Sequence, residues 1–167
     1  QVSNVPIAET ITDRKEILSG QTRLPISSDR LHGSINLMGA RFDDLTLADY
    51  KETTDKDAQE VVLLSPSGAK KVYFAEFSWL ASNKNISTPN SKTKWTTNHP
   101  QLIPGLPVTL EWDNKEGLKF FITIALDRDY MFTINKRVEN YGQQDVTLSS
   151  YGIINRKRDM SKKTFYI

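Results

Sequence analysis

The chain has 167 residues, of which 38% are hydrophobic and 25% are charged, and its formal net charge is +2. A chain of this length can bury one hydrophobic core, and this composition is typical of a globular segment rather than a disordered or membrane-embedded one. The small net charge argues against a nucleic-acid-binding protein, which needs a strongly basic face, and the absence of cysteine excludes disulfides, thiolate catalysis and cysteine zinc sites.

The N-terminal residues lack the periodicity of a packed element. Residues 1–22 are rich in Thr, Ser, Asn, Glu and Gln, and only residues 12–18 have the pattern of one or two turns of helix. We therefore expect residues 1–22 to be a linker or flexible arm and residues 23–167 to form a β-sandwich domain. The start at Gln1, without a signal-peptide pattern, indicates a processed or excised piece.

Alternating apolar and polar residues then predict a hairpin. One strand is expected over residues 31–37, and a second strand runs through Phe42, Leu45 and Leu47 after a turn at Gly39. Because the side chains of a strand alternate between its two faces, each strand would place one apolar face on a core.

An acidic segment, a short apolar run and a longer strand follow. Residues 43–60 carry seven acidic side chains against two lysines. The apolar run 61–64 stops at the turn composition of residues 65–68, and residues 72–80 predict a strand in the centre of a sheet. Residues 82–105, dominated by Ser, Asn, Thr, Lys and Pro, are expected to form a long surface loop.

The strongest alternation lies in the second half of the chain. Strands are predicted over residues 106–112, 120–126, 130–134 and 146–151, with polar turns between them, as in an antiparallel meander. No stretch of ten or more residues has the apolar spacing of an amphipathic helix, so the predicted fold class is all-β, a sandwich or a barrel. Residues 164–167 have the pattern of another strand start, and we expect the natural polypeptide to continue beyond them.

No pattern in the chain indicates a catalytic, cofactor or metal site. His32 and His99 lack metal-ligand spacing and are expected on the surface, and the glycine-rich phosphate loops and the G-x-S-x-G elbow are absent. The adjacent carboxylates Asp43 and Asp44 lie on a predicted strand and would point to opposite sides of it. We expect no enzyme activity, no cofactor, and no catalytic or metal-binding residue.

Two features remain as candidates for ligand contact. Trp79 and Trp112 lie on apolar strand faces and are expected in the core, whereas Trp95, in the polar loop, is the better candidate for contact with a sugar or peptide. A basic cluster near the C-terminus is most simply a solvated loop. The alternative is a contact for anionic lipid headgroups or an acidic partner. This cluster consists of Arg156, Lys157, Arg158, Lys162 and Lys163.

A resemblance to a known family rests on several strings of residues. The string GSINLMGARFDDLTL at residues 33–47 resembles the opening hairpin of the periplasmic domain in bacterial YidC insertases, which has the pattern G-S-I-x-L-x-G-A-R-x-D-D-L. The likeness continues in order over more than half of the chain. The further strings are VVLLSPSGA (61–69), YFAEFSW (73–79), LIPGLPVTLEWDN (102–114), GLKFFITIALDRDYMFTI (117–134) and VEN (138–140).

The resemblance implies a twisted antiparallel β-super-sandwich, similar to galactose mutarotase but without its sugar chemistry, and incomplete here at the C-terminus. It places the domain on the periplasmic face of the bacterial inner membrane, between the first two membrane helices of a multi-pass parent protein. That parent inserts and folds inner-membrane proteins with or without the Sec translocon. The implied partners are Sec translocon components such as SecDF and nascent membrane proteins. The SecDF contact lies toward the later part of the domain, partly or wholly outside this chain.

Other functions stay open on the sequence. The fold resemblance and Trp95 are also compatible with a carbohydrate-binding or aldose-epimerase-like sandwich. Exposed sheet edges are able to accept an extended client segment by strand addition.

Overall fold

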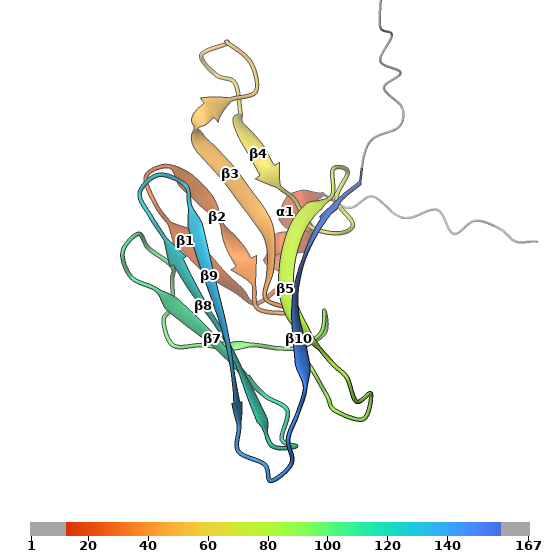
Figure 1. The fold of residues 1–167 in the computed structure, drawn as a ribbon. Helices are drawn as coiled ribbons and strands as arrows, with labels where there is room; N and C mark the ends of the chain where they lie inside the picture. Colours follow the sequence, from red (N-terminus) through yellow and green to blue (C-terminus); the bar gives the residue numbers. More distant parts are fainter. Residues whose placement is uncertain (1–12, 158–167) are drawn as a thin grey trace, which may run out of the picture.

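The structure, a computed structural model, describes residues 13–157 and shows two antiparallel sheets packed face to face (Figure 1). The predicted all-β antiparallel sandwich is confirmed. The large sheet has the order β1-β2-β3-β5-β10, with β4 paired to β3. Its strands are β1 (Arg23–Ser27), β2 (Leu31–Asn36), β3 (Arg41–Lys51), β4 (Glu60–Leu64), β5 (Tyr73–Ala81) and β10 (Leu148–Arg156).

The small sheet has the order β6-β7-β8-β9. Its strands are β6 (Thr96–Thr97), β7 (Val108–Asp113), β8 (Leu118–Leu126) and β9 (Phe132–Asn140). The one helix of the described residues, α1 (Arg14–Ser19), confirms the predicted short helical turn. Asp13 caps it by accepting a hydrogen bond from the Lys15 backbone N–H at 2.8 Å. Within residues 13–157, no helix has the length and apolar character needed to cross a bilayer.

The core lies between the two sheets and is made by the alternation that the sequence shows. β8 is the centre of the small sheet, and its Phe120, Ile122 and Ile124 side chains are almost completely buried. Trp79 of β5 packs on Phe120 with ring centroids 5.2 Å apart, which confirms its predicted place in the core. Burying each of these large side chains stabilises the fold by about 1.5–3 kcal/mol.

β1 is a strand that the sequence did not reveal. Only Leu24 and Ile26 of this five-residue strand alternate into the core, and Pro25 lies between them. Proline lacks a backbone donor and is therefore tolerated on an edge strand. β1 is such an edge, and the Pro25 carbonyl still accepts a hydrogen bond from the Leu102 N–H at 2.9 Å.

Part of the segment 82–105 belongs to the core, and the expectation of a surface loop throughout is wrong. Trp95 is 2% exposed and Leu102 is fully buried. The backbone N–H of Trp95 donates to the Leu37 carbonyl at 2.9 Å, and the Ser27 N–H donates to the Leu102 carbonyl at 2.9 Å. The segment therefore closes one side of the sandwich, where the edges β1 and β6 lie.

The β2–β3 hairpin is confirmed, but it contains a bulge. Ser34 pairs with Asp44 while its neighbour Ile35 pairs with Phe42, so Asp43 is an extra residue on β3. Because of this bulge, Asp43 and Asp44 do not simply alternate between the two faces. Arg23 contacts Asp43 and the Ser34 hydroxyl, and that hydroxyl also contacts Asp44. The expectation that the two carboxylates point to opposite sides is therefore wrong.

Candidate functional site

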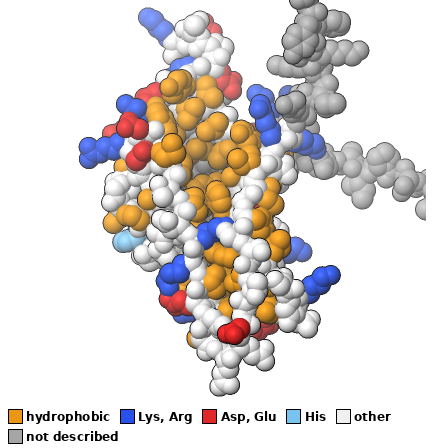
Figure 2. Space-filling view, viewed as in Figure 1, with side chains coloured by type: hydrophobic (Ala, Val, Ile, Leu, Met, Phe, Trp, Pro, Cys, Tyr) orange, Lys and Arg blue, Asp and Glu red, His pale blue; other side chains and the backbone are white. Residues whose placement is uncertain are grey.

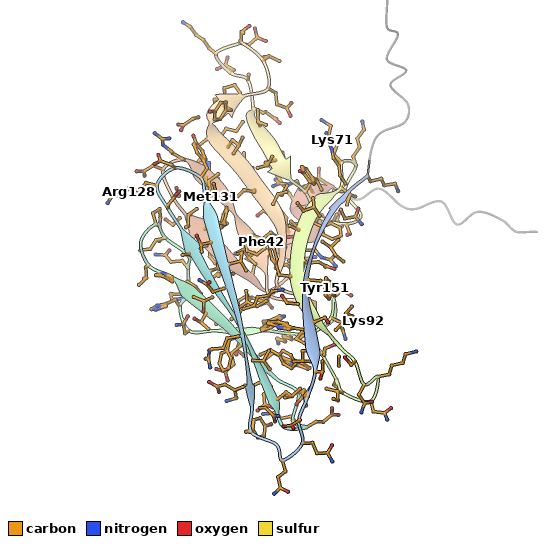
Figure 3. All side chains as sticks on the ribbon, in the orientation of Figure 1. Phe42, Lys71, Lys92, Arg128, Met131 and Tyr151 are labelled. Atoms are coloured by element: carbon orange, nitrogen blue, oxygen red, sulfur yellow. The ribbon has the colours of Figure 1, made fainter. Side chains whose placement is uncertain are left out.

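The second side of the sandwich lies between the edge strands β9 and β10. Apolar side chains form a stretch down the middle of this face (Figure 2). Phe132 of β9 and Phe77 of β5 both pack edge-on against Phe42, at ring-centroid distances of 5.6 and 5.8 Å, and all three rings lie between the sheets. In Figure 3, the labelled Phe42 lies in this interior, whereas Tyr151 lies on β10.

A cleft of about 330 Å³ lies toward the end of this side, where β9 leads into β10. Its wall combines a buried aromatic ring, aliphatic side chains and two neutral polar groups, and no charged side chain lines it. Such a surface suits contact with an apolar group, and none of its lining side chains is a base that would activate the Ser150 hydroxyl. The lining residues are Trp79, Leu118, Val138, Asn140, Val146, Leu148 and Ser150.

Lys136 bridges the two sheets beside the cleft. It occupies an inward position of β9, and its ammonium donates to the Ser78 carbonyl at 3.1 Å and to the Tyr151 carbonyl at 2.8 Å. The same ammonium lies 5.1 Å from the centre of the Trp79 ring. Desolvation lowers the pKa of Lys136 below its usual value. An inward lysine on an edge strand also opposes edge-to-edge association.

Replacing Lys136 by Met tests this bridge. The variant keeps the aliphatic stem but leaves the carbonyls of Ser78 and Tyr151 without this donor, so we expect the free energy of unfolding to fall by about 1–3 kcal/mol. Urea denaturation followed by tryptophan fluorescence measures the change. Lys119→Met is the matched control, because Lys119 forms a surface ion pair with Glu111 at 3.1 Å and should cost less than about 1 kcal/mol. Equal losses in the two variants would contradict the bridging role.

The residues singled out from the sequence do not form one site. Trp95 is buried among core residues, so the expectation of an exposed ring for sugar or peptide contact is wrong. Its neighbours in the sequence are polar, so the local pattern gave no indication of this burial. Arg156 and Lys157 are exposed at the end of β10, whereas Arg158 lies outside the described residues. Whether these basic residues bind a partner stays a prediction.

The two histidines are far from a metal-site arrangement. His32 is exposed, with Nδ1 3.0 Å from Glu60 Oε2, and His99 is half-buried in the segment that follows β6. Among residues 13–157, no group of three or more His, Cys, Asp or Glu side chains is placed to hold a metal ion.

A buried charge cluster lies on the outer side of the β2–β3 hairpin, and the sequence did not predict it. Arg23 pairs with Asp43, and the side chains of this pair are only 9% and 2% exposed. Arg14 of α1 pairs with Asp44, which also accepts a hydrogen bond from the Ser34 hydroxyl at 2.6 Å. Burial raises the pKa of Asp43 above its usual value, although Arg23 acts in the opposite direction. The cluster ties α1 and β1 to β3, so its role is structural.

Comparison with known proteins identifies what the chain is similar to. The profile of the YidC periplasmic domain family matches residues 23–167. The Membrane protein insertase YidC of Rickettsia bellii is 42% identical over 145 residues, covering 87% of this chain and 26% of the relative. That of Methylobacterium radiotolerans is 42% identical over 154 residues, covering 92% and 25%. That of Granulibacter bethesdensis is 42% identical over 134 residues, covering 80% and 23%. The chain therefore spans about a quarter of the length of these curated relatives.

Proposed function

Because the chain belongs to the YidC periplasmic domain family, we propose that it is an accessory, non-catalytic interaction module of a membrane protein insertase. The observation that carries the proposal is the extent of the family match, which spans every strand of the sandwich from β1 to β10. The parent protein would insert and fold inner-membrane proteins, with or without the Sec translocon. This domain would lie on the periplasmic face of the inner membrane.

The surface between β9 and β10 supports a role in contact rather than catalysis. Its cleft has mainly apolar and no charged lining side chains, and the ammonium of Lys136 beside it is engaged by two backbone carbonyls. Interaction surfaces of proteins combine an apolar centre with a polar rim in this way. The proposed partners of the parent are nascent membrane proteins and Sec translocon components such as SecDF.

Domain deletion in the full-length parent tests the proposal. Cells depleted of their own insertase would carry the intact parent, or a parent that lacks the whole periplasmic domain, of which the region corresponding to residues 23–157 is a part. We expect the deletion to leave insertion of a reporter membrane protein close to normal, because the module is accessory, and to reduce the SecDF that co-purifies with the parent. Protease accessibility of the reporter and quantitative immunoblotting measure the two outcomes.

A domain replacement separates contact from spacing in this experiment. An unrelated periplasmic β-sandwich of similar size, placed at the same position, should not restore SecDF co-purification. Complete loss of reporter insertion on deletion would contradict the accessory role. Unchanged recovery of SecDF would contradict the partner role.

A further inference from the structure

We propose that the end of the sandwich at which β5 begins and β10 ends binds the headgroups of anionic phospholipids. The basic patch there consists of Lys70, Lys71, Arg156 and Lys157, and all four side chains are exposed. The inference rests on the proposed function only in taking the parent to be a membrane protein. It assigns this module a direct contact with the lipid surface, in addition to its protein partners.

The pairing of β5 with β10 creates the patch from two distant parts of the chain. Lys70 and Lys71 stand immediately before β5, while Arg156 is the last residue of β10 and pairs with Tyr73. The Lys157 N–H donates to the Val72 carbonyl at 2.9 Å and continues this pairing by one residue. Lys70 and Lys71 therefore lie beside Arg156 and Lys157. In the sequence, only Arg156 and Lys157 belong to a longer basic run.

Three of the four cations of the patch are not neutralised by carboxylates of the described residues. Lys70, Lys71 and Arg156 form no ion pair with an acidic side chain among residues 13–157. By contrast, the nearby Arg41 is paired with Glu76 at 2.8 Å. In Figure 3, the labelled Lys71 extends outward from this end of the molecule. Several uncompensated cations at one place attract an anionic membrane surface.

An exposed apolar side chain beside the patch favours a membrane over an acidic protein as the partner. Ile154 is 73% exposed and lies two residues before Arg156, on the same face of β10. The Arg156 guanidinium lies 5.4 Å from the centre of the Tyr73 ring. Apolar and aromatic groups next to basic ones match the boundary between headgroups and acyl chains, where both find favourable surroundings.

Vesicle binding by the 167-residue chain tests the inference. We expect the chain to sediment with vesicles of phosphatidylethanolamine and phosphatidylglycerol but not with vesicles of phosphatidylcholine, and to be released as salt is raised. Replacing both Lys70 and Lys71 by Gln should lower the partition coefficient about 25-fold, because each charge contributes about fivefold, or about 1 kcal/mol. The matched control, Lys84→Gln with Lys92→Gln, removes the same charge from two exposed positions of the 82–105 segment and should change binding less than about twofold.

The Ile154→Gln variant separates the apolar contribution. It should weaken vesicle binding several-fold by an amount that does not depend on salt, because no charge is removed. Absence of binding to phosphatidylglycerol would overturn the inference, as would equal losses in the two double lysine variants. So would binding to soluble polyglutamate that matches or exceeds binding to the vesicles, since that result would indicate an acidic protein partner. The reporter and SecDF assays in cells are independent of vesicle binding. Failure to bind vesicles would therefore not contradict the proposed function, and a negative result in cells would not contradict lipid binding.

Discussion

Asp43→Ala is expected to lower the free energy of unfolding by about 3–5 kcal/mol, because the substitution leaves the buried guanidinium of Arg23 without its counter-charge. Both side chains are almost inaccessible to water, so the solvent cannot take the place of the lost carboxylate. Urea or thermal denaturation, followed by the far-ultraviolet circular dichroism of the sheets, measures the loss.

A double substitution distinguishes the cost of breaking this pair from the net value of having it. Burial raises the pKa of Asp43 despite the nearby Arg23. The attraction between the two charges therefore does little more than offset the free energy needed to remove them from water. We therefore expect Arg23→Met combined with Asp43→Leu to be much closer to the wild-type chain in stability than Asp43→Ala is. Asp129→Ala is the surface control, because its pair with Arg30 is exposed and should cost less than about 1 kcal/mol. A double variant as unstable as Asp43→Ala would show that the charges themselves stabilise the fold.

Gly33→Ala is expected to reduce the free energy of unfolding by about 2–6 kcal/mol. Gly33 has a φ of 152°, and a Cβ at this position would lie 2.1 Å from the Asp44 carbonyl oxygen. This oxygen belongs to the backbone of the paired strand, at the β3 bulge, so it can only move if the hairpin distorts. Backbone strain of about 1–3 kcal/mol and overpacking of about 1–3 kcal/mol both contribute.

Gly105→Ala provides the comparison for Gly33→Ala. Gly105 also has a positive φ, of 83°, but no atom lies within 4 Å of the place that a Cβ would take. Its substitution should therefore cost only the backbone term, about 1–2 kcal/mol. Denaturation of the two variants side by side separates the clash from the strain. Similar losses of stability in the two variants would show that the contact between the added Cβ and the Asp44 carbonyl oxygen adds no measurable cost.

The strands with regular alternation were predictable, whereas elements held by distant partners were not. β8 follows from Phe120 to Leu126 alone, because a central strand needs apolar residues that recur along its own length. β1 and β6 are short, and each forms because another segment supplies backbone partners. β9 runs from Phe132 to Asn140, beyond the predicted end at residue 134, because its later positions pair with β8 although Lys136 interrupts the apolar pattern.

The candidate residues show the same division. Trp79 was correctly placed in the core, because its neighbours on β5 alternate. Trp95 was placed on the surface, because its neighbours in the sequence are polar and its partners, such as the Leu37 carbonyl that accepts its N–H, are far away in the sequence. The bulge at Asp43 was equally hidden, since register is a property of two strands together.

Local alternation and ordered motifs therefore determined the all-β class, the order of the longer strands and the resemblance to an insertase domain. Only the tertiary structure decided that Arg14, Arg23, Asp43 and Asp44 meet in one buried cluster, that the apolar cleft opens beside β10, and that Lys70 and Lys71 lie next to Arg156 and Lys157. The physical reason is that periodicity records which face of a segment avoids water, whereas the identity of its neighbours depends on strand pairing across the whole chain.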